Sequence, residues 1–292
     1  MGLALSVVSP AQTAFTRMLV TGTELISFAA MNTDREPAVA GLFYPASPTT
    51  LQRHVQTLMA AAEPGSLMDL KALVVPHAGY QYSGPIAASG YAQLAAFAGR
   101  IRRVILFGPA HRAYFRGLAY PDAARLLTPL GAVALDREAL EGLADLPQVK
   151  RIDRAFTGEH CLEVQLPFLQ TLLPDFCVVP LLVGDATAQE VAEVMERLWG
   201  GPETLILVSS DLSHYLDYET AKRTDLRTTQ AIERLDPEAL DHHCACGCTP
   251  LCGLLLEARR RGLKERTLDL RNSGDTAGPR DQVVGYGAYA FY

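Results

Sequence analysis

Short apolar runs alternate with amphipathic stretches along most of this chain. Four of the runs are rich in β-branched residues and have the length and continuous hydrophobicity of buried strands in a parallel sheet. They cover residues 72–75, 104–107, 178–183 and 204–208. Stretches between and beside them repeat apolar residues at helical spacing. Strands that alternate with helices predict an α/β protein with a mostly parallel central sheet covered by helices on both faces.

The amphipathic stretches predict helices at 47–59, 163–172, 186–198, 219–235 and 251–261. The first begins with Ser47 followed by Pro48, a common pairing of an N-cap with proline in the first turn. No Gly/Ser-rich linker and no change in composition interrupts the sequence from 31 to 292, which predicts a single domain. Residues 1–30 are expected to be an N-terminal extension that is disordered or not native, with translation starting at Met31.

The bulk composition narrows the class of protein. The chain has 292 residues, of which 49% are hydrophobic and 20% charged, and its net charge is −6. A nucleic-acid-binding protein would normally show a basic stripe, so this class is not expected. No apolar run reaches the roughly 18 residues of a membrane-spanning helix, and residues 1–30 lack the basic start of a signal peptide. We therefore expect a cytoplasmic protein with reduced cysteines.

Polar clusters follow three of the predicted strands. The first strand runs into His77, the second into His111, and the fourth into a segment with Asp211 and His214. In an open α/β sheet, ligands bind outside the carboxyl ends of the strands, so these side chains are expected to meet in one pocket. Imidazole is a ligand for zinc, copper and iron alike.

Other interpretations of these residues remain open. A single histidine at a strand end is more often structural than a metal ligand, although two in equivalent positions strengthen the case for a site. Asp211 and His214 have the spacing of an orienting carboxylate and a base. Serines beside them suggest a Ser-His-Asp hydrolase, but the chain contains no G-x-S-x-G elbow. The G-x-G-x-x-A pattern at 285–290 has no helix after it, so it is interpreted as a closing strand.

Four of the six cysteines lie within nine residues, at Cys244, Cys246, Cys248 and Cys252. This spacing is too tight for an ordinary disulfide framework. The cluster could be a small thiolate metal site, although it matches no C-x-x-C zinc pair. Alternatively, one cysteine contributes to the pocket and the others are small buried hydrophobes. The residues alone do not decide between these interpretations.

Several segments in a fixed order resemble the Memo family, the B component of the AmmeMemoRadiSam group. The resemblance extends from Arg35 to Tyr292 and includes the His77 and His111 segments. Its other markers are PAVAGLFYP at 37–45, TPLG at 128–131, EHCLEVQLP at 159–167, NSGDT at 272–276 and VGYG at 284–287. Cys161 departs from the pattern, because serine is common at that position.

The resemblance implies the three-layer α/β/α fold of class III extradiol dioxygenases, which hold non-haem Fe(II) with two histidines and a carboxylate. His77 and His111 match the two histidine ligands, and Cys246 matches the third Memo ligand, with Cys244 or Cys248 as alternatives. His214 matches the acid/base histidine, oriented or tuned by Asp211. The residues implied to line or support the pocket are Glu159, His160 and Tyr80.

A thiolate in place of the carboxylate makes the implied site softer. We expect one metal ion, with Fe(II) or copper ahead of zinc. One implied function is a metal-dependent oxidoreductase that acts on a small molecule. Another is a binding module for a peptide or protein that keeps a vestigial pocket, and a third is a structural zinc protein with His214 as fourth ligand. Radical SAM and AMMECR-type proteins are the partners that the resemblance implies.

Overall fold

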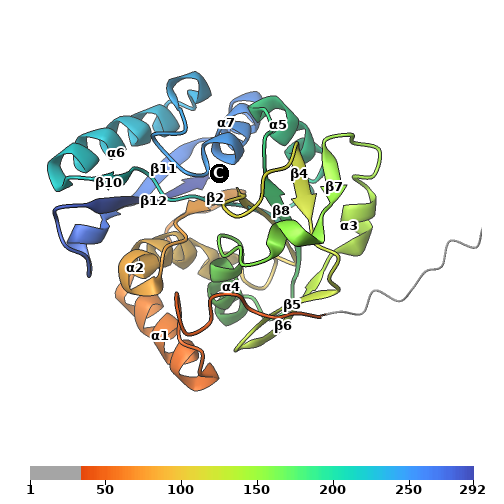
Figure 1. Ribbon diagram of the computed structural model, residues 1–292, viewed down its shortest axis with the longest axis horizontal. Helices are drawn as coiled ribbons and strands as arrows, with labels where there is room; N and C mark the ends of the chain where they lie inside the picture. Colours follow the sequence, from red (N-terminus) through yellow and green to blue (C-terminus); the bar gives the residue numbers. More distant parts are fainter. Residues whose placement is uncertain (1–33) are drawn as a thin grey trace, which may run out of the picture. The chain divides into compact units, whose positions relative to one another are not determined.

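The protein is described here by a computed structural model that covers residues 34–292, so the expectation for residues 1–30 lies outside the described residues. A 12-stranded sheet forms the centre of this part of the chain. Five neighbouring strands in it run parallel. In order across the sheet they are β6 (Gly131–Leu135), β8 (Cys177–Val183), β3 (Arg103–Pro109), β9 (Thr204–Ser209) and β2 (Ala72–Val75) (Figure 1).

All four strands expected from the apolar runs form, as β2, β3, β8 and β9. Every residue of β2 and β9 is buried, as expected for strands with neighbours on both sides and helices on both faces. The prediction of an α/β protein with a largely parallel sheet is confirmed.

The two edges of the sheet are antiparallel or mixed. On one edge, β12 (Val283–Phe291) pairs antiparallel with β2, β11 (Glu265–Asn272) and β10 (His214–Leu216). The G-x-G-x-x-A pattern lies within β12, which confirms its interpretation as a closing strand. The other edge holds β5 (Arg125–Thr128) and β1 (Asp34–Arg35), with β4 (Leu118–Tyr120) and β7 (Val149–Arg151) branching from β8. These strands are too short to have produced a clear pattern.

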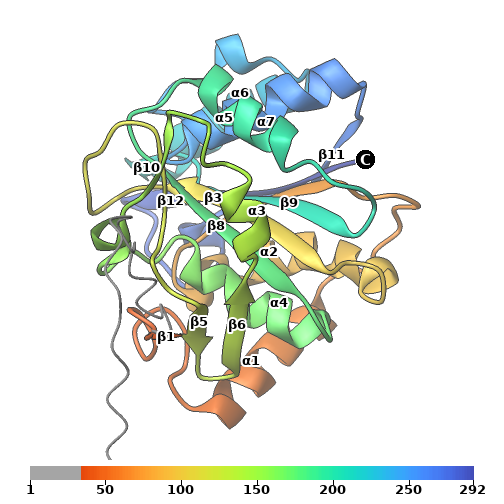
Figure 2. The same ribbon diagram turned by 90° about the vertical axis from the view of Figure 1, so that its right-hand side faces the viewer.

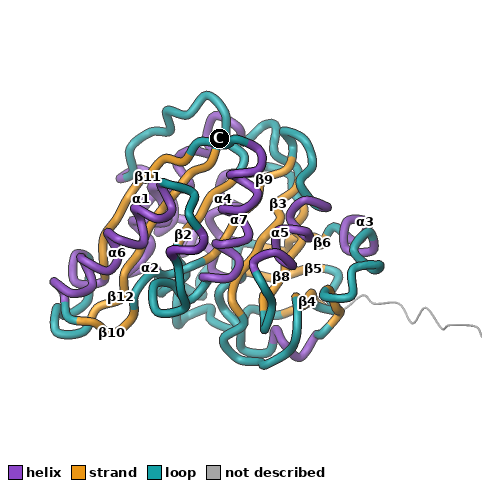
Figure 3. The backbone as a smooth tube through the Cα atoms, turned by 90° about the horizontal axis from the view of Figure 1, so that it is seen from above, coloured by secondary structure: helices purple, strands orange, loops and turns teal. Residues whose placement is uncertain are grey.

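Helices cover both faces of the sheet, which gives the three layers (Figures 1 and 2). One face carries α1 (Pro48–Ala61), α2 (Tyr80–Tyr91) and α4 (Leu166–Leu172). The opposite face carries α5 (Ala188–Arg197), α6 (Tyr218–Glu233) and α7 (Cys248–Arg261). Figure 3 shows the helices running alongside the strands of the sheet, with the short α3 (Arg137–Glu141) at its edge. Among residues 34–292, no helix is long and apolar enough to cross a membrane.

The sequence pattern did not predict α2, the helix that follows His77. Gly84, Pro85 and Gly90 lie inside it, and glycine and proline are poor helix formers. The packing explains them: a Cβ atom at Gly90 would lie 2.6 Å from a methyl group of Val75 on β2. Close approach of α2 to the sheet therefore overrides the low helix propensity.

Candidate metal centre

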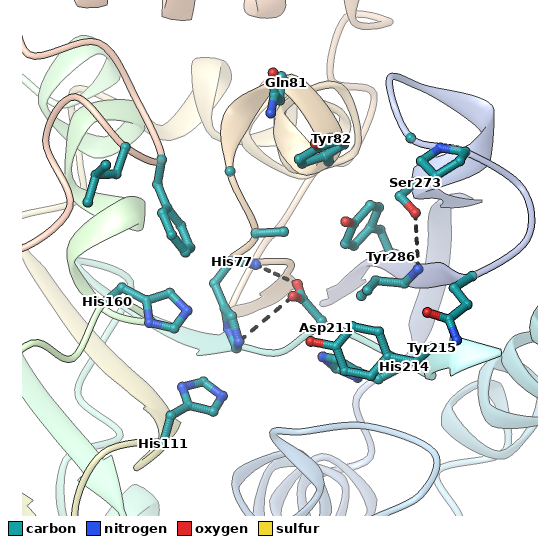
Figure 4. Close-up of a pocket in the computed structure, with 18 of the residues that line it drawn as sticks. His77, Gln81, Tyr82, His111, His160, Asp211, His214, Tyr215, Ser273 and Tyr286 are labelled. Atoms are coloured by element: carbon teal, nitrogen blue, oxygen red, sulfur yellow. Dashed lines mark hydrogen bonds and ion pairs between the residues drawn. The ribbon is translucent and has the colours of Figure 1, made fainter.

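The carboxyl ends of β2, β3 and β9 open into a cavity of about 660 Å³. The structure brings His77, His111, Asp211 and His214 together in its wall, as expected from their positions after the strands. Figure 4 shows His77 in the middle, with His111 and His160 on one side and Asp211 and His214 on the other. The site therefore combines residues that are far apart in the sequence.

Three imidazoles form a tight cluster. The ligand nitrogens of His77, His111 and His160 lie within 4.8 Å of one another, close enough to hold a metal ion. The rings of His77 and His111 meet edge to face, with centroids 5.1 Å apart and planes at 72°. His160 instead stacks on His111, with centroids 5.0 Å apart and planes at 16°.

Hydrogen bonds fix the proton on the His77 ring. Its Nδ1 lies 3.0 Å from Ser209 Oγ. The Ser209 hydroxyl donates its single hydrogen to the carbonyl of Cys161 at 2.6 Å, and it accepts from Gln165 Nε2 at 2.8 Å. Because that hydrogen is already used, Nδ1 of His77 must be the donor. The lone pair of the neutral ring is therefore on Nε2. Burial lowers the pKa of His77 to about 3, so the ring is neutral.

Glu159 fixes His111 in the same way. Its buried carboxylate accepts the backbone N–H of His111 at 2.6 Å and lies 3.0 Å from the ring Nδ1. It also accepts the backbone N–H groups of His160 and Cys161, at 2.8 and 3.1 Å. Burial alone would raise the pKa of Glu159, but the hydrogen bond and electrostatic attraction of the His111 ring, with the hydrogen bonds from the backbone N–H groups, hold it at about 2. An ionised carboxylate can only accept, so Nδ1 of His111 donates and Nε2 carries the lone pair.

His214 has its own acceptor. Its Nδ1 lies 2.8 Å from the carbonyl oxygen of Leu212, which can only accept, so Nε2 again carries the lone pair of the neutral ring. The orienting group of His214 is thus a backbone carbonyl. Asp211 accepts the backbone N–H of His77 at 2.7 Å, and its Oδ2 is 4.0 Å from His77 Nε2. Burial raises the pKa of Asp211.

The cysteines of the cluster face different neighbours. Cys246 Sγ lies 3.3 Å from His77 Nε2 and accepts the backbone N–H of Asp211 at 3.3 Å. Burial raises the pKa of the Cys246 thiol to about 12. Of the three cysteines left open by the sequence, Cys246 is therefore the one beside the histidines. Two groups of three donors within 4.8 Å occur among residues 34–292, His77/His111/His160 and His111/Glu159/Cys161, and Cys246 is in neither.

Tyr80 does not line the cavity. Its hydroxyl donates to the carbonyl of Val164 at 2.6 Å, and its buried ring packs on Phe168, so it anchors α2 against the segment before α4. The cavity is instead lined by aromatic residues that the sequence interpretation did not single out. They are Phe43, Tyr82, Tyr215 and Tyr286. The available signal was their position inside segments already noted. Phe43 lies in PAVAGLFYP, Tyr82 and Tyr215 lie close in sequence to His77 and His214, and Tyr286 lies in the closing Gly-Tyr-Gly.

Fold and site thus define an α/β protein with a histidine-rich cavity at the carboxyl ends of its parallel strands. The family model described as Memo-like protein matches residues 35–290, and the chain belongs to this family. A MEMO1 family protein of Aeropyrum pernix is 37% identical over 276 residues, covering 87% of this chain and 98% of the relative. One of Aquifex aeolicus is 36% identical over 264 residues, covering 86% and 97%. A crystal structure of an uncharacterized Escherichia coli protein aligns with a TM-score of 0.46 and 14% identity, covering 76% of this chain and all of that one.

Proposed function

We propose that this protein is a metal-dependent oxidoreductase acting on a small molecule, with a metal ion on His77, His111 and Cys246. The observation that supports this most strongly is the shared proton arrangement of the two histidines. Each donates its Nδ1–H to an acceptor held by the protein, which leaves Nε2 as the nitrogen that can bind a metal ion. Metal-ligating histidines in proteins are typically held in this way, because the second hydrogen bond fixes the tautomer and the ring orientation.

Cys246 fits the third ligand position better than His160. A metal ion must lie near the plane of each imidazole that binds it, and the nearly parallel planes of His160 and His111 do not converge on one point. Two ligands on a tetrahedral ion, one nitrogen at about 2.0 Å and one sulfur at about 2.3 Å, would be about 3.5 Å apart. The observed distance from His77 Nε2 to Cys246 Sγ is 3.3 Å. A bound ion would replace the thiol proton, and His111, whose side chain is 29% exposed and follows β3, would supply the other imidazole.

The donor set favours a soft, redox-active ion. Two imidazoles and a thiolate suit copper or an electron-rich Fe(II) centre, which we place ahead of zinc. Three protein ligands leave positions open, and a bound ion then supplies a Lewis-acidic, redox-active centre for a small chelating molecule. The aromatic walls of the cavity suit a hydroxylated ring.

His214 serves as the acid/base group in this proposal. Because its Nδ1–H is held by the Leu212 carbonyl, Nε2 is the atom that accepts or returns a proton. Asp211 supports the site by accepting the backbone N–H of His77, which holds the start of the segment that carries this ligand. Glu159 orients His111, and His160 forms the wall stacked against it.

A second candidate function is the binding of a peptide at the same cavity. Two exposed apolar side chains stand at its rim: Leu42 is 79% exposed and Tyr215 is 72% exposed. Such side chains offer contact surface for a partner segment. The radical SAM and AMMECR-type partners implied by the resemblance belong with this candidate.

Oxygen consumption distinguishes the two candidates. The protein would be loaded anaerobically with Fe(II) or copper, and oxygen uptake would be followed with a panel of catechols and other hydroxylated aromatics. The oxidoreductase proposal expects uptake that depends on the added compound and is absent in His77→Ala. Metal-loaded protein that consumes no oxygen with any compound, yet retains a peptide partner in pull-down experiments, would support the binding module instead.

A further inference from the structure

A second pair of thiols lies outside the proposed centre, on the first two turns of α7. Cys248 and Cys252 are both buried, and their Sγ atoms are 3.8 Å apart. Residues four apart lie on the same face of a helix, so the two side chains point to one spot. Cys246, two residues earlier, turns instead toward His77 and Asp211. The proposed oxidoreductase site therefore leaves this pair unused.

The distance between the two sulfurs has the value required by a shared metal ion. Two thiolates bound at about 2.3 Å to a tetrahedral ion are separated by about 3.8 Å. Ligands at positions i and i+4 on one helix are a recurring way of holding such an ion, because both reach it without bending the helix. The pair thus provides two sulfur ligands that already have the separation required by a bound ion.

Further donors lie beside the pair in the segment before α7. The carbonyl oxygen of Pro237 is 3.5 Å from Cys252 Sγ. Cys244 is close enough to Cys252, and Asp241 to Cys248, for electrostatic interaction. Cys244 Sγ is held at 3.2 Å by Asp241, in a turn whose neighbours at 241–243 are exposed. Cys244 therefore offers a third sulfur from the turn that precedes α7, and solvent borders that turn.

We propose that Cys248 and Cys252 form a second metal site, separate from the histidine centre, with Cys244 as its third ligand. The ion is a thiophilic one of the Cu(I) or Zn(II) class, because thiolates select these ions. On binding, each thiol gives its proton to the solvent and forms a metal–sulfur bond, without oxidation of either partner. The two sites share no ligand, so each fills without the other.

Metal titration of the full chain tests this inference. Reduced, metal-free protein would be titrated anaerobically with Cu(I) in competition with bathocuproine disulfonate, and with Zn(II) in competition with a chromophoric chelator. Wild type should bind two equivalents, and Cys252→Ser should bind one. Cys246→Ser should also retain one equivalent, held by the α7 pair. Cys177→Ser is the matched control, because Cys177 lies on β8 beside Asp136, and it should still bind two.

The outcomes separate this site from the histidine centre. One equivalent in wild type that is lost in Cys252→Ser and kept in Cys246→Ser would support the α7 site while contradicting the histidine centre. Equal binding by wild type and Cys252→Ser would overturn the α7 site. Alkylation of the wild-type protein provides a second test. Bound Cu(I) or Zn(II) should protect Cys248 and Cys252 from N-ethylmaleimide, and alkylation at the same rate with and without metal would contradict the proposal.

Discussion

The two sides of the cavity are built in different ways. His77 and His111 follow β2 and β3 in the parallel centre of the sheet, and buried side chains hold their Nδ1 atoms. His214 begins β10, a strand of three residues at the edge of the sheet, and a backbone carbonyl holds its ring. The pairing of β10 with β12 shifts register after His214, and Tyr215 has a left-handed backbone, with φ of 58°.

This difference matches the two tasks assigned to the histidines. Metal ligands need fixed directions, which strands with neighbours on both sides and buried hydrogen-bond partners supply. A proton-transferring group needs a defined tautomer and access to solvent or substrate, which an edge strand allows. Backbone strain at Tyr215 is typical of functional positions, where the surrounding structure maintains a costly conformation. The comparison therefore predicts different consequences for changes on the two sides.

The largest expected effect is on turnover and concerns the edge side. His214→Ala should lower the rate by 10²- to 10⁴-fold, which is the usual contribution of a general acid/base, while the metal content stays that of wild type. Steady-state oxygen uptake and elemental analysis of the same sample measure the two quantities. His242→Ala, which removes an exposed histidine, is the control. Loss of metal in His214→Ala would place His214 among the ligands and remove the distinction between the two sides.

On the central side, Glu159→Gln should lower metal affinity by 10- to 100-fold, because the amide no longer provides a charged acceptor for His111 Nδ1. Chelator competition measures this change. Glu163→Gln is a matched control, since Glu163 lies in the same segment and accepts the N–H groups of Ala38 and Val39 without contacting a histidine. An equal loss of affinity in both variants would show that the effect is a general loosening of the segment.

On the side of the cavity that holds His214, one buried carboxyl group should make the free energy of unfolding depend on pH. Asp225 on α6 accepts the backbone N–H of Ser213, next to His214, and burial raises the pKa of this carboxyl group to about 6. An unfolded aspartate titrates near pH 3.9, so the folded state holds the extra proton between these values. Stability from Asp225 is therefore present below about pH 4 and is lost as the pH rises through 6. Asp225→Asn should remove this pH dependence, which is worth on the order of 3 kcal/mol.

Urea unfolding of metal-free protein at pH 4.5 and pH 7.5 measures the Asp225 term. The free energy of unfolding of wild type should fall relative to that of Asp225→Asn as the pH rises, because only wild type loses the contribution of Asp225. A difference between the two proteins that does not change with pH would contradict this explanation.

The smallest expected effect is at Tyr215. Glycine adopts a positive φ without steric cost, so Tyr215→Gly should raise the free energy of unfolding by up to about 1 kcal/mol or leave it unchanged. Tyr114→Gly, at a residue that is 87% exposed and does not have a positive φ, should lower it. Thermal unfolding compares the two variants. Destabilisation of similar size in both would mean that the Tyr215 backbone is not strained.

The sequence predicted the parts of this molecule that repeat a simple pattern. Buried parallel strands are continuous apolar runs, so β2, β3, β8 and β9 could be predicted, and with them the meeting of His77, His111 and His214. The helix α2 could not be predicted, because Gly84 and Gly90 are favoured only by close packing, against Leu58 and Val75 respectively. The short edge strands are formed by pairing between distant segments, which leaves little local signal.

The finer features of the site depend on distances that no local pattern encodes. Ser209 and Leu212 hold two of the rings only because β9 ends beside β2 and the chain then turns back. The stacking of His160 on His111, and the separation of Cys246 from the Cys248/Cys252 pair, likewise follow from tertiary packing. The family resemblance supplied the ligand assignment that the residues alone left open.

The central claim is that one ion is held by His77, His111 and Cys246, and metal content after anaerobic purification tests it most directly. Protein carrying Cys252→Ser is the appropriate background, because it removes the α7 pair. Elemental analysis should find about one iron or copper per chain in this background and almost none after adding His77→Ala, His111→Ala or Cys246→Ala. Metal that persists without Cys246, or a background protein that never binds one equivalent, would contradict the assignment.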